Sequence, residues 1–140
     1  MPSVNDIKAY AQGSARNRIV LCNSRIEGLT YIDVGYELSL AIGNACDATN
    51  FESLLREIFS RSQHDGIIGQ YLALDNIGIL FEDDLHIHLE SIFDSYSKGQ
   101  TLLICAEGEI ENNTFKFMSS DRCKVNIGRL SFIRIEKTTR

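Results

Sequence analysis

The chain has 140 residues, of which 44% are hydrophobic, and it carries a formal net charge of −5. This length and apolar content suit one globular domain with its own core and are too small for two full domains. A net negative charge without a basic stripe argues against a general nucleic-acid binder, because neutralisation of phosphates by Lys and Arg dominates the affinity of such proteins. We therefore expect no direct nucleic-acid binding.

Membrane insertion and disulfide bonding are also disfavoured by the sequence. No apolar run approaches the roughly 20 residues of a membrane-spanning helix, and the N-terminus lacks the basic segment and apolar core of a secretion signal. We expect a soluble, cytoplasmic protein. The four cysteines never form a C-x-x-C pair, which favours free, buried thiols over disulfides or a zinc site. They are Cys22, Cys46, Cys105 and Cys123.

Hydrophobic patterning in the first half of the chain predicts both helices and strands. A helix opens the chain, because Ser3 and Asp6 have the spacing of a capping box. The continuous apolar block Ile19–Cys22 is typical of an inner strand that is buried on both faces. The expected elements are a helix ended by Gly13, strands over 19–22 and 29–34, a helix from 36 to about 45, a helix over 51–59 capped by Thr49 or Asn50, and a loop over 64–66 with His64 in solvent.

The most informative stretch, residues 70–81, lies in the second half. Tyr71–Leu74 is an unbroken apolar block and predicts another inner strand. Asp75 and Asn76 follow it directly, at the carboxyl edge where open α/β sheets place their ligand chemistry. The remaining expected elements are a helix that starts near 82–84 and ends at Lys98–Gly99, a strand over 101–105, a hairpin over 109–117 turning at Asn112 and Asn113, and a strand over 131–136.

These elements predict a single-domain α/β fold, over residues 1–140, with a mixed, mainly parallel sheet and flanking helices. In a nucleotide-hydrolysing P-loop protein, an aspartate in the position of Asp75 helps to hold the magnesium ion. The phosphate cradle, G-x-x-x-x-G-K-S/T, is missing from the sequence. We therefore interpret the chain as a degenerate P-loop NTPase-like protein that has lost its nucleotide, and we expect no cofactor.

Two segments resemble a known family. They are YIDVGYELS at Tyr31–Ser39 and LALDNIGILFEDDLHIHLESIFDSYSKGQTLLI at Leu72–Ile104, supported more weakly by the hairpin and the last strand. They resemble BrxF, a small P-loop ATPase-like component of some BREX anti-phage defence systems. The resemblance implies partners among the other proteins of such a system, large ATPases or PglZ-type phosphatase-like proteins. Among the functional positions of the family, it carries over only Asp75, which matches the Walker-B-like acid.

The chain departs from that family between its first two strands. BrxF-like proteins look like strand, P-loop, helix, strand, whereas here the strand Ile19–Cys22 is followed by only the six residues 23–28. A parallel crossover needs a dozen or more residues, and six extended residues reach at most about 20 Å. We therefore expect strands 19–22 and 29–34 to pair as an antiparallel hairpin or nearly so.

The densest polar cluster is the segment 82–90. His86 and His88 form an H-x-H pair that could chelate zinc from a strand, with Asp84 nearby as a further ligand. Leucines and an isoleucine interleave with these residues, as they do in an ordinary amphipathic segment with exposed imidazoles. Asp75 is a weak catalytic candidate, because an aspartate after a strand also makes a good turn or cap. No complete catalytic or metal site is expected.

The leading hypothesis is a non-catalytic protein-binding subunit or adaptor of a bacterial anti-phage defence complex. One alternative is a residual nucleotide- or metal-dependent enzyme that uses Asp75 with His86 and His88. Another is an immunity or inhibitor protein that neutralises a basic toxin surface through its net negative charge. The expected protein-binding residues are Glu82, Asp83, His86, His88, Glu109, Glu111 and Phe115.

Overall fold

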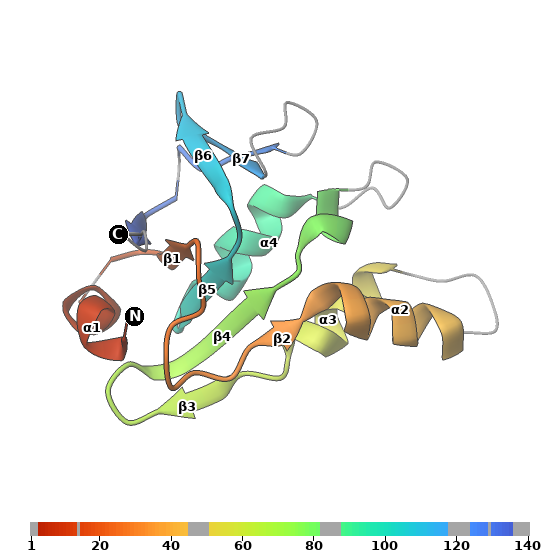
Figure 1. Cartoon of the computed structure of the whole chain (residues 1–140), viewed down its shortest axis with the longest axis horizontal. Helices are drawn as coiled ribbons and strands as arrows, with labels where there is room; N and C mark the ends of the chain where they lie inside the picture. The colour runs from red at the N-terminus through yellow and green to blue at the C-terminus, as the bar shows by residue number, and fades with distance from the viewer. Residues whose placement is uncertain are drawn as a thin grey trace.

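A computed structural model of the chain describes residues 3–13, 15–44, 51–81, 88–117, 124–128 and 130–135. Its helices pack on a central sheet, and a smaller sheet lies beyond the end of that sheet (Figure 1). The helices are α1 (Val4–Ala11), α2 (Val34–Asn44), α3 (Phe51–Phe59) and α4 (Leu89–Tyr96), with a 3₁₀ turn η1 (Gly78–Phe81). The strands are β1 (Arg18–Cys22), β2 (Ile32–Asp33), β3 (Gln63–Asp65), β4 (Gly69–Asp75), β5 (Thr101–Cys105), β6 (Gly108–Glu111), β7 (Thr114–Phe117), β8 (Lys124–Asn126) and β9 (Phe132–Ile135).

The central sheet has six strands, five of them in the order β2-β4-β5-β1-β9. All four neighbour pairs along this order are parallel, and β3 pairs antiparallel with β4. This confirms the predicted α/β fold with a mixed, mainly parallel sheet and flanking helices. In the described part of the chain, no helix is both long and apolar enough to cross a membrane.

The expected antiparallel pairing of the first two strands is wrong. β4 and β5 lie between β2 and β1, and all of these strands run parallel. β2 is only two residues long and pairs with Leu74 and Asp75, at the end of β4. The connection over residues 23–31 therefore does not return along a full strand. It crosses three strand spacings, about 14 Å, which is well within the roughly 30 Å that such a segment can span.

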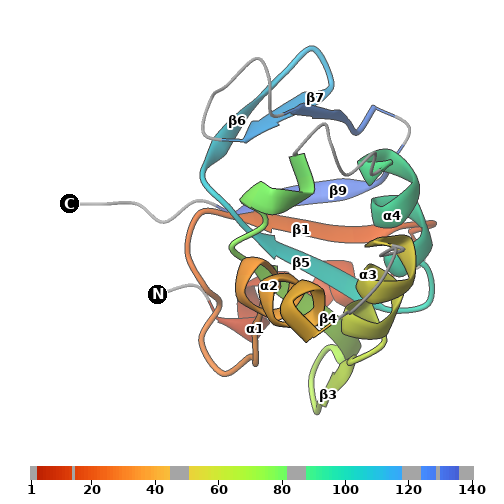
Figure 2. The same ribbon diagram turned by 90° about the vertical axis from the view of Figure 1, so that its right-hand side faces the viewer.

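Two hydrophobic layers enclose the sheet. Alternate residues of each inner strand enter opposite layers, so that Ile19 and Leu21 face one layer while Val20 and Cys22 face the other. The first layer is completed by α2, α3, α4 and the smaller sheet, and the second by α1 and the connection over residues 23–31. Figure 2 shows α2, α3 and α4 in front of the sheet and α1 behind it.

The predicted helices are present, with small shifts at their ends. At the start of α1, the backbone N–H of Ser3 donates to the Asp6 carboxylate at 2.7 Å, as in the expected capping box. α2 begins at Val34, two residues before its predicted start. The predicted start of the last helix near 82–84, and the caps Thr49 and Asn50 expected before α3, fall outside the described residues.

The segment predicted as a loop over residues 64–66 is instead mainly a strand. β3 pairs His64 with Gln70 and Asp65 with Gly69, forming a hairpin with β4. The Asp65 carboxylate accepts the backbone N–H groups of Ile67 and Ile68 at 2.8 and 3.1 Å and closes the turn. Because β3 is held by the backbone of β4 and not by buried side chains, its polar sequence carries no strand pattern. His64 is exposed, as expected.

The smaller sheet contains the predicted hairpin and one additional strand. β6 and β7 pair across a two-residue turn in which Asn112 and Asn113 have φ of 52° and 63°, as the sequence predicts. β8 adds to β7, with Val125 as its single buried residue. The stacked rings of Phe81 and Phe117, 5.2 Å apart, connect this sheet to η1.

Candidate functional site

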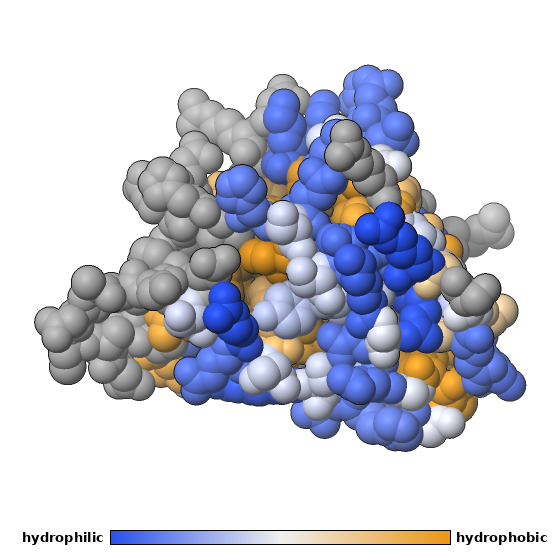
Figure 3. All heavy atoms as spheres, turned by 180° about the vertical axis from the view of Figure 1, so that it is seen from behind, coloured by the Kyte–Doolittle hydropathy of each residue, from blue (hydrophilic) through white to orange (hydrophobic). Residues whose placement is uncertain are grey.

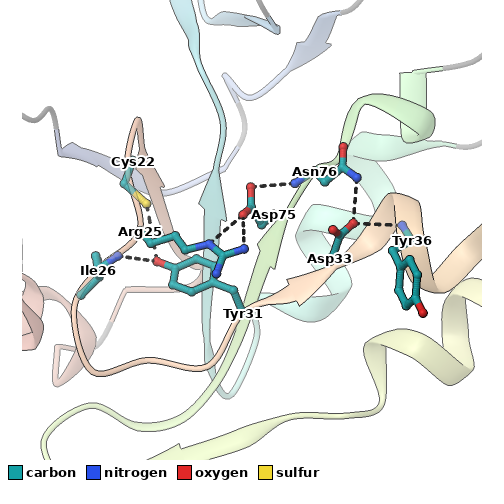
Figure 4. A network of polar contacts seen from close by, with 8 residues as sticks. All are labelled: Cys22, Arg25, Ile26, Tyr31, Asp33, Tyr36, Asp75 and Asn76. Carbon is teal, nitrogen blue, oxygen red and sulfur yellow. Dashed lines mark hydrogen bonds and ion pairs between the residues drawn. The ribbon is translucent and has the colours of Figure 1, made fainter.

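The five parallel strands of the central sheet all end at one edge. The last residues of β1, β2, β4 and β5 are Cys22, Asp33, Asp75 and Cys105. Because the carboxyl ends of parallel strands share an edge, this is where an α/β protein is expected to bind a ligand. Figure 4 shows the polar contacts that connect the loops at this edge.

Asp75, the weak catalytic candidate, forms an ion pair at this edge. The Arg25 guanidinium donates from Nε to Asp75 Oδ2 at 2.8 Å, and its Nη2 lies 2.6 Å from the same oxygen. The other oxygen, Oδ1, accepts the backbone N–H of Asn76 at 2.8 Å. Both carboxylate oxygens therefore already have protein donors. In this arrangement Asp75 holds Arg25, and with it the connection over residues 23–31, against the end of β4.

Arg25 is held from its other side by an aromatic ring. Its guanidinium carbon lies 5.5 Å from the centroid of the Tyr31 ring, a cation–π distance. The Tyr31 hydroxyl accepts the backbone N–H of Ile26 at 2.9 Å. Burial raises the pKa of Tyr31 well above its ordinary value, so this hydroxyl stays protonated. Arg25 and Ile26, near the start of the connection over residues 23–31, are thus in contact with Tyr31 at its end. Arg25 also joins the connection to Asp75 of β4 (Figure 4).

Asp33 occupies the N-terminus of α2. Its Oδ1 accepts the backbone N–H of Tyr36 at 2.9 Å, in the third position of the helix, and the Nδ2 of Asn76 at 2.7 Å. These two hydrogen bonds, the one from Tyr36 first, lower the pKa of Asp33. An aspartate in this position is a normal N-cap. The helix end that would otherwise attract an anion therefore already holds a carboxylate of the chain itself.

The loops after β2 and β4 pack closely against each other. The backbone N–H of Gly35 donates to the carbonyl of Asn76 at 3.1 Å, and a Cβ atom at Gly35 would lie 2.5 Å from Asn76 Nδ2. Asn76 has a φ of 52°, a value that asparagine tolerates better than most residues. The close approach therefore depends on glycine at position 35.

The predicted metal-binding segment can be placed only in part. Glu82, Asp83, Asp84 and His86 lie outside the described residues, while His88 is exposed directly before α4. Within the residue ranges that the structure covers, no three His, Cys, Asp or Glu side chains group closely enough to hold a metal ion. The zinc hypothesis for His86, His88 and Asp84 stays a prediction.

One predicted protein-binding residue is buried. Phe115 is 3% exposed and packs in the first hydrophobic layer, so it cannot contact a partner of the folded protein. Strand alternation explains the error, because Phe115 pairs with Ile110 on the inner face of the hairpin. Glu109 and Glu111 lie on the outer face and are exposed, with Glu111 3.3 Å from the ammonium group of Lys116.

Two residues of this edge, Arg25 and Asp33, are not among the predicted site residues. Arg25 lies in the short segment 23–28, and Asp33 lies in the predicted strand over 29–34. For Asp33 a signal existed, since an aspartate directly before an apolar helical pattern is a normal N-cap. Arg25 gives no such signal, because its partner Asp75 is distant in sequence.

Two apolar side chains near this edge are exposed. Tyr36 is 60% and Leu40 is 45% exposed, one helical turn apart on α2. Seen from behind the view of Figure 1, hydrophobic residues appear as separate patches among hydrophilic ones (Figure 3).

The fold and the site define an α/β protein whose sheet edge is closed by an Arg–Asp ion pair and a capped helix. Comparisons with protein-family models, with curated proteins and with solved structures found no match. The chemistry of the edge is therefore interpreted from its own geometry.

Proposed function

We propose that this chain is a non-catalytic protein-binding subunit or adaptor of a bacterial anti-phage defence complex, a cytoplasmic protein of P-loop NTPase-like architecture that has lost nucleotide binding. The Arg25–Asp75 ion pair carries the proposal. Asp75 is the one position that the BrxF resemblance maps to a magnesium-binding acid, and its carboxylate holds a protein cation instead.

The surroundings of the ion pair also disfavour a triphosphate. A P-loop offers backbone N–H groups, a lysine and a hydroxyl at the end of its strand. Here the connection over residues 23–31 leads from β1 to β2 without a helix, and Asp33 caps α2. A bound phosphate would have to displace the Asp33 cap and would lie near two carboxylates, both of which repel it.

Exposed side chains of the described part of the chain support a role in protein binding. Tyr36 and Leu40 present apolar surface beside the closed edge, and Glu109 and Glu111 present negative charge on the hairpin. Aromatic residues are common at the centre of protein interfaces. The net charge of −5 suits a partner with a basic surface. By resemblance to BrxF, that partner is a large ATPase or a PglZ-type phosphatase-like protein.

Nucleotide binding is tested by calorimetric titration of the purified chain with Mg·ATP up to about 1 mM, the range in which weak sites saturate. We expect no saturable heat, no phosphate release, and the same result for Asp75→Ala. Micromolar binding or hydrolysis that Asp75→Ala abolishes would overturn the proposal in favour of a residual nucleotide-dependent enzyme.

Protein binding is tested by co-expression of the chain with defence-system proteins from the same host, followed by size-exclusion chromatography. We expect a stable complex, weakened about tenfold or more by the double charge reversal Glu109→Lys with Glu111→Lys. The matched control reverses the exposed Glu57 of α3 and should leave the complex intact. Absence of any complex would contradict the proposal, and a complex formed instead with a basic toxin would favour the immunity alternative.

A further inference from the structure

Two cysteines lie side by side at the closed edge. Cys22 of β1 and Cys105 of β5 are direct partners in the parallel ladder, and both thiols are free. Paired residues of neighbouring strands project to the same face, and both side chains pack in the layer that contains α1. Neighbouring strands are about 4.8 Å apart, which falls within the Cα separation of roughly 4.4–6.8 Å found in disulfides.

The two thiols differ in exposure. Cys22 is 2% exposed, and its sulfur donates to the carbonyl of Ile104 at 3.5 Å. Cys105 is only partly buried and ends its strand at the edge. A peroxide molecule in solvent can therefore reach Cys105 before it reaches Cys22.

The surroundings also differ in their effect on ionisation. A hydrogen bond with Cys22 lowers the pKa of Cys105, and the charge of Arg25 acts in the same direction, against burial and the charges of Asp75 and Glu107. The same hydrogen bond, followed by burial, raises the pKa of Cys22. The less buried member of the pair is thus the more nucleophilic one, as in other reactive thiol sites.

We propose that Cys22 and Cys105 form a redox-active pair that hydrogen peroxide or another hydroperoxide converts to a disulfide, with Cys105 as the attacking thiol and Cys22 as the resolving thiol. This inference does not depend on the proposed function.

The reaction balances in two steps. The Cys105 thiolate attacks one oxygen of hydrogen peroxide, the O–O bond breaks, and the departing hydroxide takes up the proton that Cys105 released, giving sulfenic acid and water. The Cys22 sulfur then attacks the sulfenic sulfur, an S–S bond forms, and the S–O bond breaks. The hydroxyl leaves with the Cys22 proton as a second water. Two thiols are oxidised by two electrons, and one peroxide is reduced to two waters.

The disulfide would change the contacts of the closed edge. The Tyr31 hydroxyl lies 3.9 Å from Cys22 Sγ and binds the backbone N–H of Ile26. A bond from the Cys22 sulfur to Cys105 would therefore change the surroundings of Tyr31, whose ring faces Arg25. Oxidation is therefore coupled to the position of the connection that shields Asp75.

The test uses the full chain with Cys46→Ser and Cys123→Ser, so that only the pair remains. After reduction and exposure to hydrogen peroxide, intact-mass measurement should show the loss of two hydrogen atoms, and peptide mapping should show a Cys22–Cys105 link that dithiothreitol reverses. Cys22→Ala should stop at a sulfenic acid on Cys105, trapped by dimedone. Cys105→Ala should slow the oxidation of Cys22 about tenfold or more.

Three outcomes would overturn the proposal. One is sulfinic acid on Cys105, without a disulfide, while Cys22 is present. Another is oxidation of the folded protein at a rate no higher than that of the same chain in denaturant. The third is a faster reaction at Cys22 than at Cys105. The first two measurements use the protein with both thiols intact, so they stay decisive even if a cysteine variant fails to fold.

Discussion

At the scale of single residues, the contact between Gly35 and Asn76 decides how closely the loops after β2 and β4 approach each other. Asn76 Nδ2 donates to Asp33, and its carbonyl accepts from Gly35. Asn76, the residue directly after Asp75, is thereby joined to the cap of α2 and to its second residue. The ion pair itself is half in solvent, with Arg25 59% exposed, and so adds little to stability. The rigidity of the edge therefore comes mainly from this packing.

Gly35→Ala should reduce the free energy of unfolding by about 1–3 kcal/mol, because the new methyl group would lie 2.5 Å from Asn76 Nδ2 and force it away from Asp33. Urea denaturation followed by circular dichroism measures the change. Gly66→Ala is the matched control, since a Cβ there has no neighbour within 4 Å, and its stability should be unchanged or slightly raised. Equal effects of the two substitutions would contradict the close contact.

At the scale of elements, the β6–β7 hairpin is determined by local sequence. Both turn residues have positive φ, and the strands on either side alternate inward and outward. The twist of such a turn matches that of the strands, which is why two asparagines were enough to predict it. The hairpin should therefore respond directly to changes in the turn.

Asn113→Gly should raise the stability of the protein by a few tenths of a kcal/mol, because Asn-Gly is the preferred pair for this turn. Asn113→Ala should lower it by about 1 kcal/mol, because alanine resists a φ of 63°. Thermal unfolding of the two variants beside the parent protein measures both shifts. If alanine proved as stable as glycine, the turn would not have the conformation described.

Elements that could be predicted from sequence are those with a pattern of their own. β1, β4 and β5 each contain an unbroken apolar block because both of their faces are buried there, and the apolar residues of α3 recur with the helical period. β3 and β8 have no such pattern, because the strand beside each holds it through backbone hydrogen bonds. Segments of this kind are predictable only once their neighbours are known.

In the candidate site, too, one part could be predicted from the sequence and another could not. Asp75 could be predicted, because its position after a buried strand is a local property. Its ion pair with Arg25 could not, because that contact depends on where β2 joins the sheet. The antiparallel pairing of the first two strands was predicted on the assumption of a full-length second strand. With β2 only two residues long, the connection over residues 23–31 instead crosses the sheet edge near Asp75.

At the scale of the whole molecule, the two hydrophobic layers share the same strands. In β5, Leu102 and Ile104 belong to one layer and Leu103 to the other. If one layer lost its packing, the strands that also support the other layer would be disrupted. We therefore expect the described helices and strands to unfold as one cooperative unit.

Leu102→Ala and Leu103→Ala, both at fully buried positions, should each cost about 2–5 kcal/mol. Urea transitions followed by far-ultraviolet circular dichroism and by tyrosine fluorescence should coincide in the parent and in both variants. The exposed Glu57→Ala is the control and should shift the midpoint little. A transition that splits in one variant would mean that the layers unfold separately.

The outer side of β4 is covered in two pieces by short strands from separate segments. β3 pairs with Gly69–Tyr71, and β2 pairs with Leu74 and Asp75. β2 is too short to offer a long row of free backbone groups, and the exposed residues of β3 are the polar Gln63 and His64 in place of apolar ones. Short and polar borders of this kind discourage a second molecule from adding its own strand. This side of the sheet should therefore be protected from fibril growth, although the strand behind it is among the most aggregation-prone sequences in the chain.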